Sequence, residues 1–280
     1  MKILTSAKEV VSELGSSSGE GSSRTLTVHR ASSDSSRLLH VDRASLRLGG
    51  LLPEEGKERH LVDQFRAIKR PILHKIKAMA ATAQPSDAAQ SLMVTGALPR
   101  DGKTFTCINL ALSVARERDV SALLIDADIT TPIISRVFGV EREPGFLDAL
   151  SDDSMDVEKL VRPTDLPGLF VLPVGNEHEH AAELLSSSRM KAVMARMSAL
   201  DPRRLLLFDS APLLMSNEAR SIAQMVKQVV LVVRAGVTPQ GAVRDAISVI
   251  DKDKLTGLVL NQNDLRSFNR YYGYGSYGGD

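Results

Sequence analysis

The sequence predicts an α/β fold in which helices cover both faces of a doubly wound, mostly parallel sheet. Apolar runs rich in Val, Leu and Ile alternate along the chain with segments of helical periodicity. That alternation is typical of parallel sheets, and near-continuous apolar runs indicate strands that are buried on both faces. We expect strands at residues 92–96, 122–128, 168–175, 203–209, 229–234 and 257–261, and longer helices at residues 58–81, 105–116, 217–227 and 240–250.

Length and composition fit one α/β domain with flanking segments. The chain has 280 residues, of which 43% are hydrophobic and 25% charged, and its formal net charge is +1. A net charge this small gives no overall field that would attract nucleic acid or an anionic membrane. No apolar run approaches the roughly 20 residues of a membrane span, and the first residues lack the apolar core of a secretory signal. We therefore expect a cytoplasmic protein that reaches the inner face of the membrane only through a partner.

Three segments are predicted along the chain. Residues 1–56 are rich in Ser and Gly and predict a flexible arm, whose apolar residues between 38 and 48 could fold on a partner. Residues 57–265 carry the alternating strands and helices and predict the folded domain. Residues 266–280 form a tail rich in Gly and Tyr. The one cysteine, Cys107, excludes an internal disulfide and is expected to be a buried, inert thiol.

A phosphate-binding loop is predicted where the first core strand meets its helix. Residues 95–104 read TGALPRDGKT, and Gly102 would let the backbone approach a phosphate closely. Lys103 would then reach the β- and γ-phosphates of a nucleotide, and the Thr104 hydroxyl would bind Mg²⁺. The first glycine of the usual Walker A pattern is replaced by Ala97, so the motif is a deviant one.

Carboxylates end two of the predicted strands. Asp126 and Asp128 share one face at the end of the 122–128 strand, and Asp209 ends the 203–209 strand. Like charges this close are costly without a cation, and ligands of open parallel sheets bind at the carboxyl ends of strands. A Mg²⁺–phosphate site accounts for them better than the alternative, which is that the aspartates cap the turn that follows.

All four tyrosines of the chain lie in its last ten residues, at Tyr271, Tyr272, Tyr274 and Tyr277. Glycines between them leave these side chains little core to pack on. The cluster could stack on RNA bases, could dock on a partner, or could be a phosphorylation substrate for a nucleotide site in the same or a neighbouring chain.

Taken together, these features resemble the bacterial tyrosine autokinases of exopolysaccharide synthesis, and more closely the branch associated with exosortase loci. The resemblance rests on the 95–104 loop, the strand that ends in Asp126 and Asp128, the Walker B strand that ends in Asp209, and the tyrosine cluster, and it covers residues 58–280. It implies a P-loop fold of the MinD/ParA-like superfamily. It also implies a protein-tyrosine kinase that uses ATP and Mg²⁺ to phosphorylate its own tail in trans.

The resemblance also assigns roles to single residues. Lys103, Asp126, Asp128 and Asp209 are the implied catalytic residues, with Asp126 as the base, and Thr104, Asp126 and Asp209 the implied metal ligands. The implied nucleotide contacts are Pro99, Arg100, Asp101, Gly102, Lys103, Thr104, Phe105, Arg234 and Asn261.

Partners are implied by the resemblance as well. The helix with Asp63, Arg66 and Lys69 or Arg70 is similar to the acid–arginine–arginine helix by which such kinases form homo-oligomeric rings. The family implies a membrane-spanning polysaccharide chain-length or co-polymerase protein, a cognate phosphotyrosine phosphatase, and control of polymer synthesis or export. No nucleic-acid partner is expected.

Two departures from the family pattern concern Thr130, where an arginine is usual, and Asp63, where a glutamate is usual. The alternative function is a MinD/ParA-like ATPase switch that positions a partner without kinase activity. Proteins of that kind carry an extra lysine where this chain has Leu98, which counts against a dimer of that type.

Overall fold

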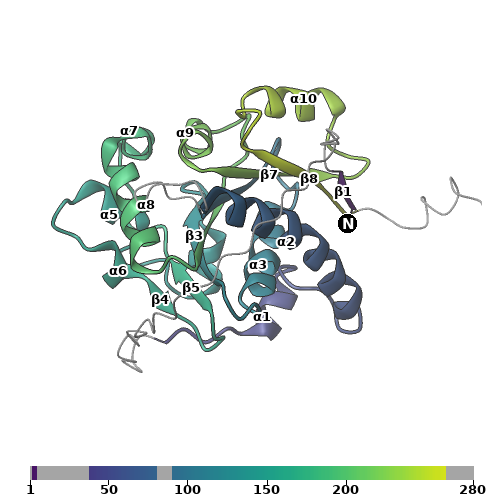
Figure 1. Cartoon of the computed structure of the whole chain (residues 1–280), viewed down its shortest axis with the longest axis horizontal. Coiled ribbons are helices and arrows are strands. Elements are labelled where there is room, and N and C mark those ends of the chain that lie inside the picture. The colour runs from purple at the N-terminus through teal and green to yellow at the C-terminus, as the bar shows by residue number, and fades with distance from the viewer. Residues whose placement is uncertain (1, 5–37, 81–89, 263–280) are drawn as a thin grey trace, which may run out of the picture.

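The structure is a computed structural model that describes residues 2–4, 38–80 and 90–262 (Figure 1). Its strands are β1 (Lys2–Leu4), β2 (Ser91–Gly96), β3 (Ser121–Ala127), β4 (Arg162–Pro163), β5 (Leu169–Leu172), β6 (Arg204–Ser210), β7 (Gln228–Arg234) and β8 (Leu255–Asn261). Its helices are α1 (Arg43–Leu48), α2 (Glu58–Ala80), α3 (Lys103–Val114), α4 (Ile133–Val137), α5 (Phe146–Ser151), α6 (Val157–Leu160), α7 (Ala181–Ser186), α8 (Ser188–Leu200), α9 (Asn217–Met225) and α10 (Gln240–Ser248).

The described strands form one sheet in the order β1-β8-β7-β2-β6-β3-β5-β4. Every pair between β8 and β5 is parallel, and only β1 and β4 at the two edges run antiparallel to their neighbours. The strand order reverses its direction of winding around β2, which places the loop after β2 at the topological switch point where such sheets bind ligands. The predicted fold class is therefore confirmed.

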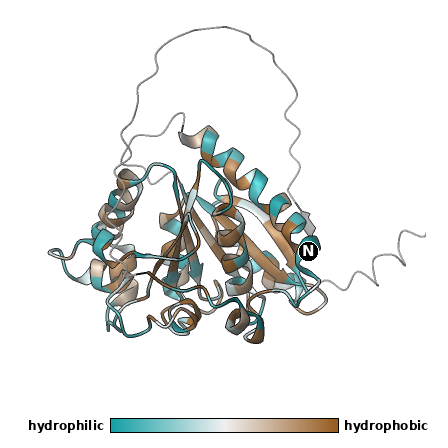
Figure 2. Ribbon diagram, turned by 90° about the horizontal axis from the view of Figure 1, so that it is seen from below, coloured by the Kyte–Doolittle hydropathy of each residue, from teal (hydrophilic) through white to brown (hydrophobic). Residues whose placement is uncertain are grey.

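Alternating side chains of the strands feed two separate hydrophobic cores. Within β2, Met93 packs into one core while Leu92 and Val94 pack into the other, as the period of two requires. The first core includes side chains of α5, α7, α8 and α9, and the second those of α1, α2, α3 and α4. Figure 2 shows the apolar strands enclosed between helices on both sides. Cys107 of α3 is buried in the second core, as predicted.

The segment 38–56 is part of the folded domain, which corrects the expected flexible arm of residues 1–56. Asp42 caps α1 by accepting hydrogen bonds from the backbone N–H groups of Ala44 and Ser45. Four apolar side chains of the segment are buried in the same core as α2 and α3, namely Leu39, Val41, Leu46 and Leu51. Residues 5–37 and the tail from residue 263 lie outside the described residues. Among the described helices, none has the length and apolar character needed to cross a membrane.

The basic residues of α2 do not all face outward. Lys69 is only 6% exposed, donates a 2.8 Å hydrogen bond to the Ser113 carbonyl, and forms an ion pair of 2.5 Å with Glu117 beyond the end of α3. Lys69 therefore holds α2 on α3 and is not available to a neighbouring chain. Arg66 and Arg70 are exposed, and Arg66 pairs with Asp63 at 3.0 Å, so Asp63, Arg66 and Arg70 are the part of the expected ring motif that can reach a partner.

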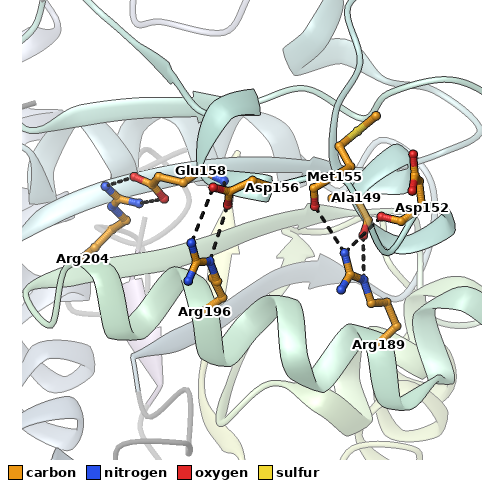
Figure 3. A network of polar contacts seen from close by, with 8 residues as sticks. All are labelled: Ala149, Asp152, Met155, Asp156, Glu158, Arg189, Arg196 and Arg204. Atoms are coloured by element: carbon orange, nitrogen blue, oxygen red, sulfur yellow. Dashed lines mark hydrogen bonds and ion pairs between the residues drawn. The ribbon is translucent and has the colours of Figure 1, made fainter. Parts of the chain in front are cut away.

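An arginine network joins α5, α6 and α8 to the start of β6 (Figure 3). Arg204, at the start of β6, donates two hydrogen bonds of 2.9 Å to the carboxylate of Glu158, and its guanidinium lies 5.1 Å from the centre of the Phe170 ring. Arg204 is 6% exposed. At the start of α8, Arg189 donates to the carbonyl oxygens of Ala149, Asp152 and Met155 and so satisfies the end of α5.

We expect Arg204→Met to lower the free energy of unfolding by about 1–3 kcal/mol, because it leaves Glu158 without its bidentate partner. The matched control is Arg203→Met, since Arg203 is the exposed neighbour and is 3.7 Å from Asp201; this change should stay within about 0.5 kcal/mol. Urea unfolding of both variants measures the difference. Equal effects would mean that the network contributes nothing specific.

Candidate active site

The loop between β2 and α3 has the backbone geometry of a phosphate cradle. Gly102 lies at the start of α3 with φ of 94°, a left-handed conformation that favours glycine. No side chain caps this end of the helix. The free N–H groups of the first turn are therefore available to an anion, and the helix dipole favours negative charge at this position.

Asp101 and Asn261 hold the shape of this loop. The Asp101 carboxylate accepts a 2.9 Å hydrogen bond from the Leu98 N–H and a 2.6 Å hydrogen bond from the Thr238 hydroxyl. The Asn261 side-chain amide donates a 3.0 Å hydrogen bond to the Asp101 carbonyl. Asp101 is 2% exposed. Its side chain thus supports the loop from behind, a bracing role that the sequence did not indicate.

A cavity of about 710 Å³ opens beside the loop. It brings together eight of the predicted site residues, namely Pro99, Arg100, Gly102, Lys103, Thr104, Phe105, Asp128 and Asn261. Thr130, which departs from the family pattern, also lines it. Arg234 is not among the lining residues; its backbone N–H instead binds the Thr238 hydroxyl at 3.0 Å. The nucleotide contacts, including that of Arg234, stay predictions.

Asp126 and Asp209 do not line this cavity; they lie on adjacent strands, two residues before its lining residues Asp128 and Ala211. They are register partners in the parallel pair of β3 and β6, and both are 0% exposed. Both carboxylate oxygens of Asp209 and the Oδ1 atom of Asp126 are buried without a hydrogen-bond partner among the described residues. Buried polar atoms are almost always satisfied, so three unsatisfied carboxylate oxygens here need an explanation.

A divalent cation fits these oxygens. Mg²⁺ takes oxygen ligands and is usually held by one or two carboxylates together with water and substrate phosphates. No group of three His, Cys, Asp or Glu side chains in the described part of the chain is arranged to hold a metal alone. Thr104 and the phosphates of a nucleotide would therefore complete the shell around Asp209 and Asp126, as the sequence predicts.

Burial governs the ionisation of all three carboxyl groups. Burial raises the pKa of Asp126 from 3.8 to about 6, although two hydrogen bonds from Ser135 oppose the rise. Burial, reinforced by the negative charge of Asp126, raises the pKa of Asp209 well above 3.8. Burial also raises the pKa of Asp128, against the nearby positive charge of Lys103. Carboxyl groups with raised pKa values beside a phosphate cradle are typical of functional sites.

Ser135 positions Asp126 and was missed by the sequence reasoning. Its backbone N–H and its hydroxyl each donate a 2.7 Å hydrogen bond to Asp126 Oδ2, and its hydroxyl accepts a 2.9 Å hydrogen bond from the Val174 N–H. These bonds hold one carboxylate oxygen and leave Oδ1 as the unsatisfied one. Asp128 likewise accepts a 3.0 Å hydrogen bond from the Thr131 N–H, so it caps the following turn as well as lining the cavity.

We expect the metal-free protein to lose stability as the pH rises from about 4 to about 6. The pKa of Asp126 is raised in the folded state, so the folded protein binds a proton more tightly than the unfolded chain, and that advantage disappears above the folded pKa of about 6. The loss should be on the order of 3 kcal/mol. Denaturant unfolding in EDTA at several pH values measures it, and Asp126→Asn should remove the part that Asp126 contributes and leave the part that the raised pKa values of Asp209 and Asp128 contribute. A variant with an unchanged pH dependence would contradict this assignment.

Comparison with known proteins places the chain in a family. No family model matches the chain. It is 31% identical over 190 residues to the tyrosine-protein kinase YwqD of Bacillus subtilis. This match covers 67% of this chain and 78% of YwqD. It is 30% identical over 211 residues to the putative tyrosine-protein kinase EpsB of Ralstonia nicotianae. That match covers 74% of this chain but only 27% of the longer EpsB protein.

The fold comparison gives the same result. The crystal structure of the VpsO kinase domain superposes with a TM-score of 0.56 at 30% sequence identity, covering 69% of this chain and 97% of that domain. The P-loop fold and the match to most of YwqD together settle the assignment at the level of the family. The chain belongs to the bacterial tyrosine-protein kinases.

Proposed function

We propose that this chain is an ATP-dependent autokinase that transfers phosphate to its own C-terminal tyrosines, one copy acting on the tail of another. The observation that carries this proposal is the site just described: a phosphate cradle and a buried lysine that line one cavity, with unsatisfied carboxylate oxygens on the adjacent strands β3 and β6. The acceptors fit as well, because every tyrosine of the chain lies between Tyr271 and Tyr277. These tyrosines lie outside the described residues.

Within that proposal the residues divide the chemistry among them. Lys103 and the N–H groups at the start of α3 would bind the phosphates and offset the charge that develops on them during transfer. A bound Mg²⁺ would supply further positive charge to the phosphate oxygens. Asp126 has a pKa of about 6 and is held by Ser135. It would orient the tyrosine hydroxyl for attack and accept its proton. Because the pKa of that hydroxyl is near 10, its positioning should matter more than full deprotonation before attack.

The wider biological role is also part of the proposal. We expect the kinase to act with a membrane-spanning chain-length or co-polymerase protein in exopolysaccharide synthesis, in the branch associated with exosortase loci, and a cognate phosphatase to reverse its action. Recruitment by that partner would hold this cytoplasmic domain at the membrane. A ring of copies would present each tail to a neighbouring site, with the exposed Arg66–Asp63 pair on the contacting helix.

Incubating the purified chain with Mg²⁺ and ATP and probing for phosphotyrosine tests the proposal. Labelling of the wild type and none of Lys103→Met is the expected result. The alternative, an ATPase switch related to MinD and ParA, predicts phosphate release from ATP with no labelled tyrosine. Mixing Lys103→Met with a chain whose four tyrosines are replaced by Phe tests transfer between copies, because only the first has a tail and only the second has an intact site.

A further inference from the structure

A second cavity lies beside the nucleotide cavity. It has a volume of about 370 Å³ and is formed by α1, the first turns of α2 and the second half of α3. Asn109 lines this second cavity, and Leu51 lines the nucleotide cavity. The Asn109 side-chain amide donates a 2.8 Å hydrogen bond to the Leu51 carbonyl. The two cavities are therefore neighbours that share one thin wall.

The second cavity combines an apolar wall with positive charge. Leu61, Phe65 and Leu112 form part of the wall. Three arginines and one glutamate line it, which leaves a net formal charge of +2. This combination suits a ligand that has both an aromatic ring and a negatively charged group.

Two of the three guanidinium groups are free to bind such a ligand. Arg47 is already paired with Glu58. Arg43 and Arg116 are exposed, and neither forms an ion pair with any described residue. A planar guanidinium can bind a phosphate through two parallel hydrogen bonds, which a lysine cannot do.

We propose that this cavity binds a phosphotyrosine of the C-terminal cluster, from the same chain or a neighbouring copy. The proposal rests on the function proposed above, whose product would carry four aryl phosphates per tail. Each phosphate bears a charge of about −1.5 to −2, which matches the two free arginines, and each phenyl ring can pack on the wall around Phe65. An unmodified tyrosine offers the ring without the charge and would bind weakly.

A synthetic peptide of residues 266–280 with phosphate on all four tyrosines tests the proposal. It is titrated into the full, unphosphorylated chain without nucleotide, so the result does not depend on whether the chain is a kinase. The phosphopeptide should bind at least about 10-fold more tightly than the unmodified peptide. Arg43→Ala and Arg116→Ala should each weaken binding of the phosphopeptide by about 10-fold. The control is Arg118→Ala, which removes an exposed arginine outside the cavity lining and should leave this binding unchanged.

Two further arms locate the site. A peptide with phosphoserine at the four positions should bind about 10-fold more weakly, because it lacks the ring. Saturating ADP should leave binding of the phosphotyrosine peptide in place. Equal binding of the phosphorylated and unmodified peptides, an equal loss in Arg118→Ala, equal binding of the phosphoserine peptide, or displacement by ADP would each overturn the proposal. Thermal melting of the arginine variants confirms that they are folded.

Discussion

Replacing Asp209 by Asn is expected to lower tyrosine phosphorylation by about 100- to 1,000-fold while leaving the metal-free protein at least as stable as the wild type. Within the described part of the chain, neither buried carboxylate oxygen of Asp209 has a hydrogen-bond partner, and burial raises the pKa of the group well above 3.8. Keeping this group ionised at neutral pH is costly in the absence of a cation. An amide of the same size removes that cost, and it also removes the negative charge and one of the two oxygens that a metal ion at the nucleotide site would use.

Phosphotyrosine labelling and denaturant unfolding in EDTA measure the two halves of this prediction. Asp119→Asn is the control, because Asp119 is exposed and its loss changes the net charge by the same amount. The control should alter neither quantity appreciably. A clear fall in the unfolding free energy of Asp209→Asn would show that the carboxylate has a stabilising partner in the metal-free protein, against the structure described above.

Replacing Gly102 by Ala should weaken ATP binding by at least about 10-fold. Gly102 has a φ of +94°, and a Cβ atom placed there would lie 1.9 Å from the side-chain nitrogen of Asn261. The backbone strain alone costs on the order of 1–2 kcal/mol. Asn261 would also have to move, and its hydrogen bond to the Asp101 carbonyl, which holds the loop, would be lost.

Titration with a fluorescent ATP analogue measures this effect. Gly139→Ala is the matched control, because Gly139 has a φ of +69° and nothing within 4 Å of the added Cβ atom. It should lower stability through the same backbone strain but leave ATP affinity unchanged. Equal affinities for Gly102→Ala and the wild type would contradict the role assigned to the loop.

Local sequence patterns were sufficient for the sheet and for the phosphate loop. The apolar runs that end at Gly96, Asp126 and Asp209 each become a buried parallel strand, and the carboxyl ends of these strands meet where the loop begins. These features depend on neighbouring residues in the chain and on the one way in which such strands pack. They could therefore be read directly from the sequence.

Tertiary contacts decided what the sequence did not reveal. The short helix α1 carries only Leu46 as a fully buried side chain, so its burial depends on α2 and α3 and not on its own periodicity. The sequence suggests that Lys69 is a surface residue, but in the structure it is buried and donates a hydrogen bond to the Ser113 carbonyl. Asn261 donates to the Asp101 carbonyl, 160 residues earlier, and Ser135 joins Asp126 to Val174, which lies 39 residues after it. No spacing rule predicts such partners.

Mass spectrometry of the tail after incubation with Mg²⁺ and ATP is the most direct test of the central claim that the nucleotide site and the tyrosine cluster are donor and acceptor. We predict phosphate on residues of the set Tyr271, Tyr272, Tyr274 and Tyr277 in the wild type, and none in Lys103→Met. A folded wild type that binds ATP and leaves all four tyrosines unmodified, with its predicted partner present or absent, would contradict the account.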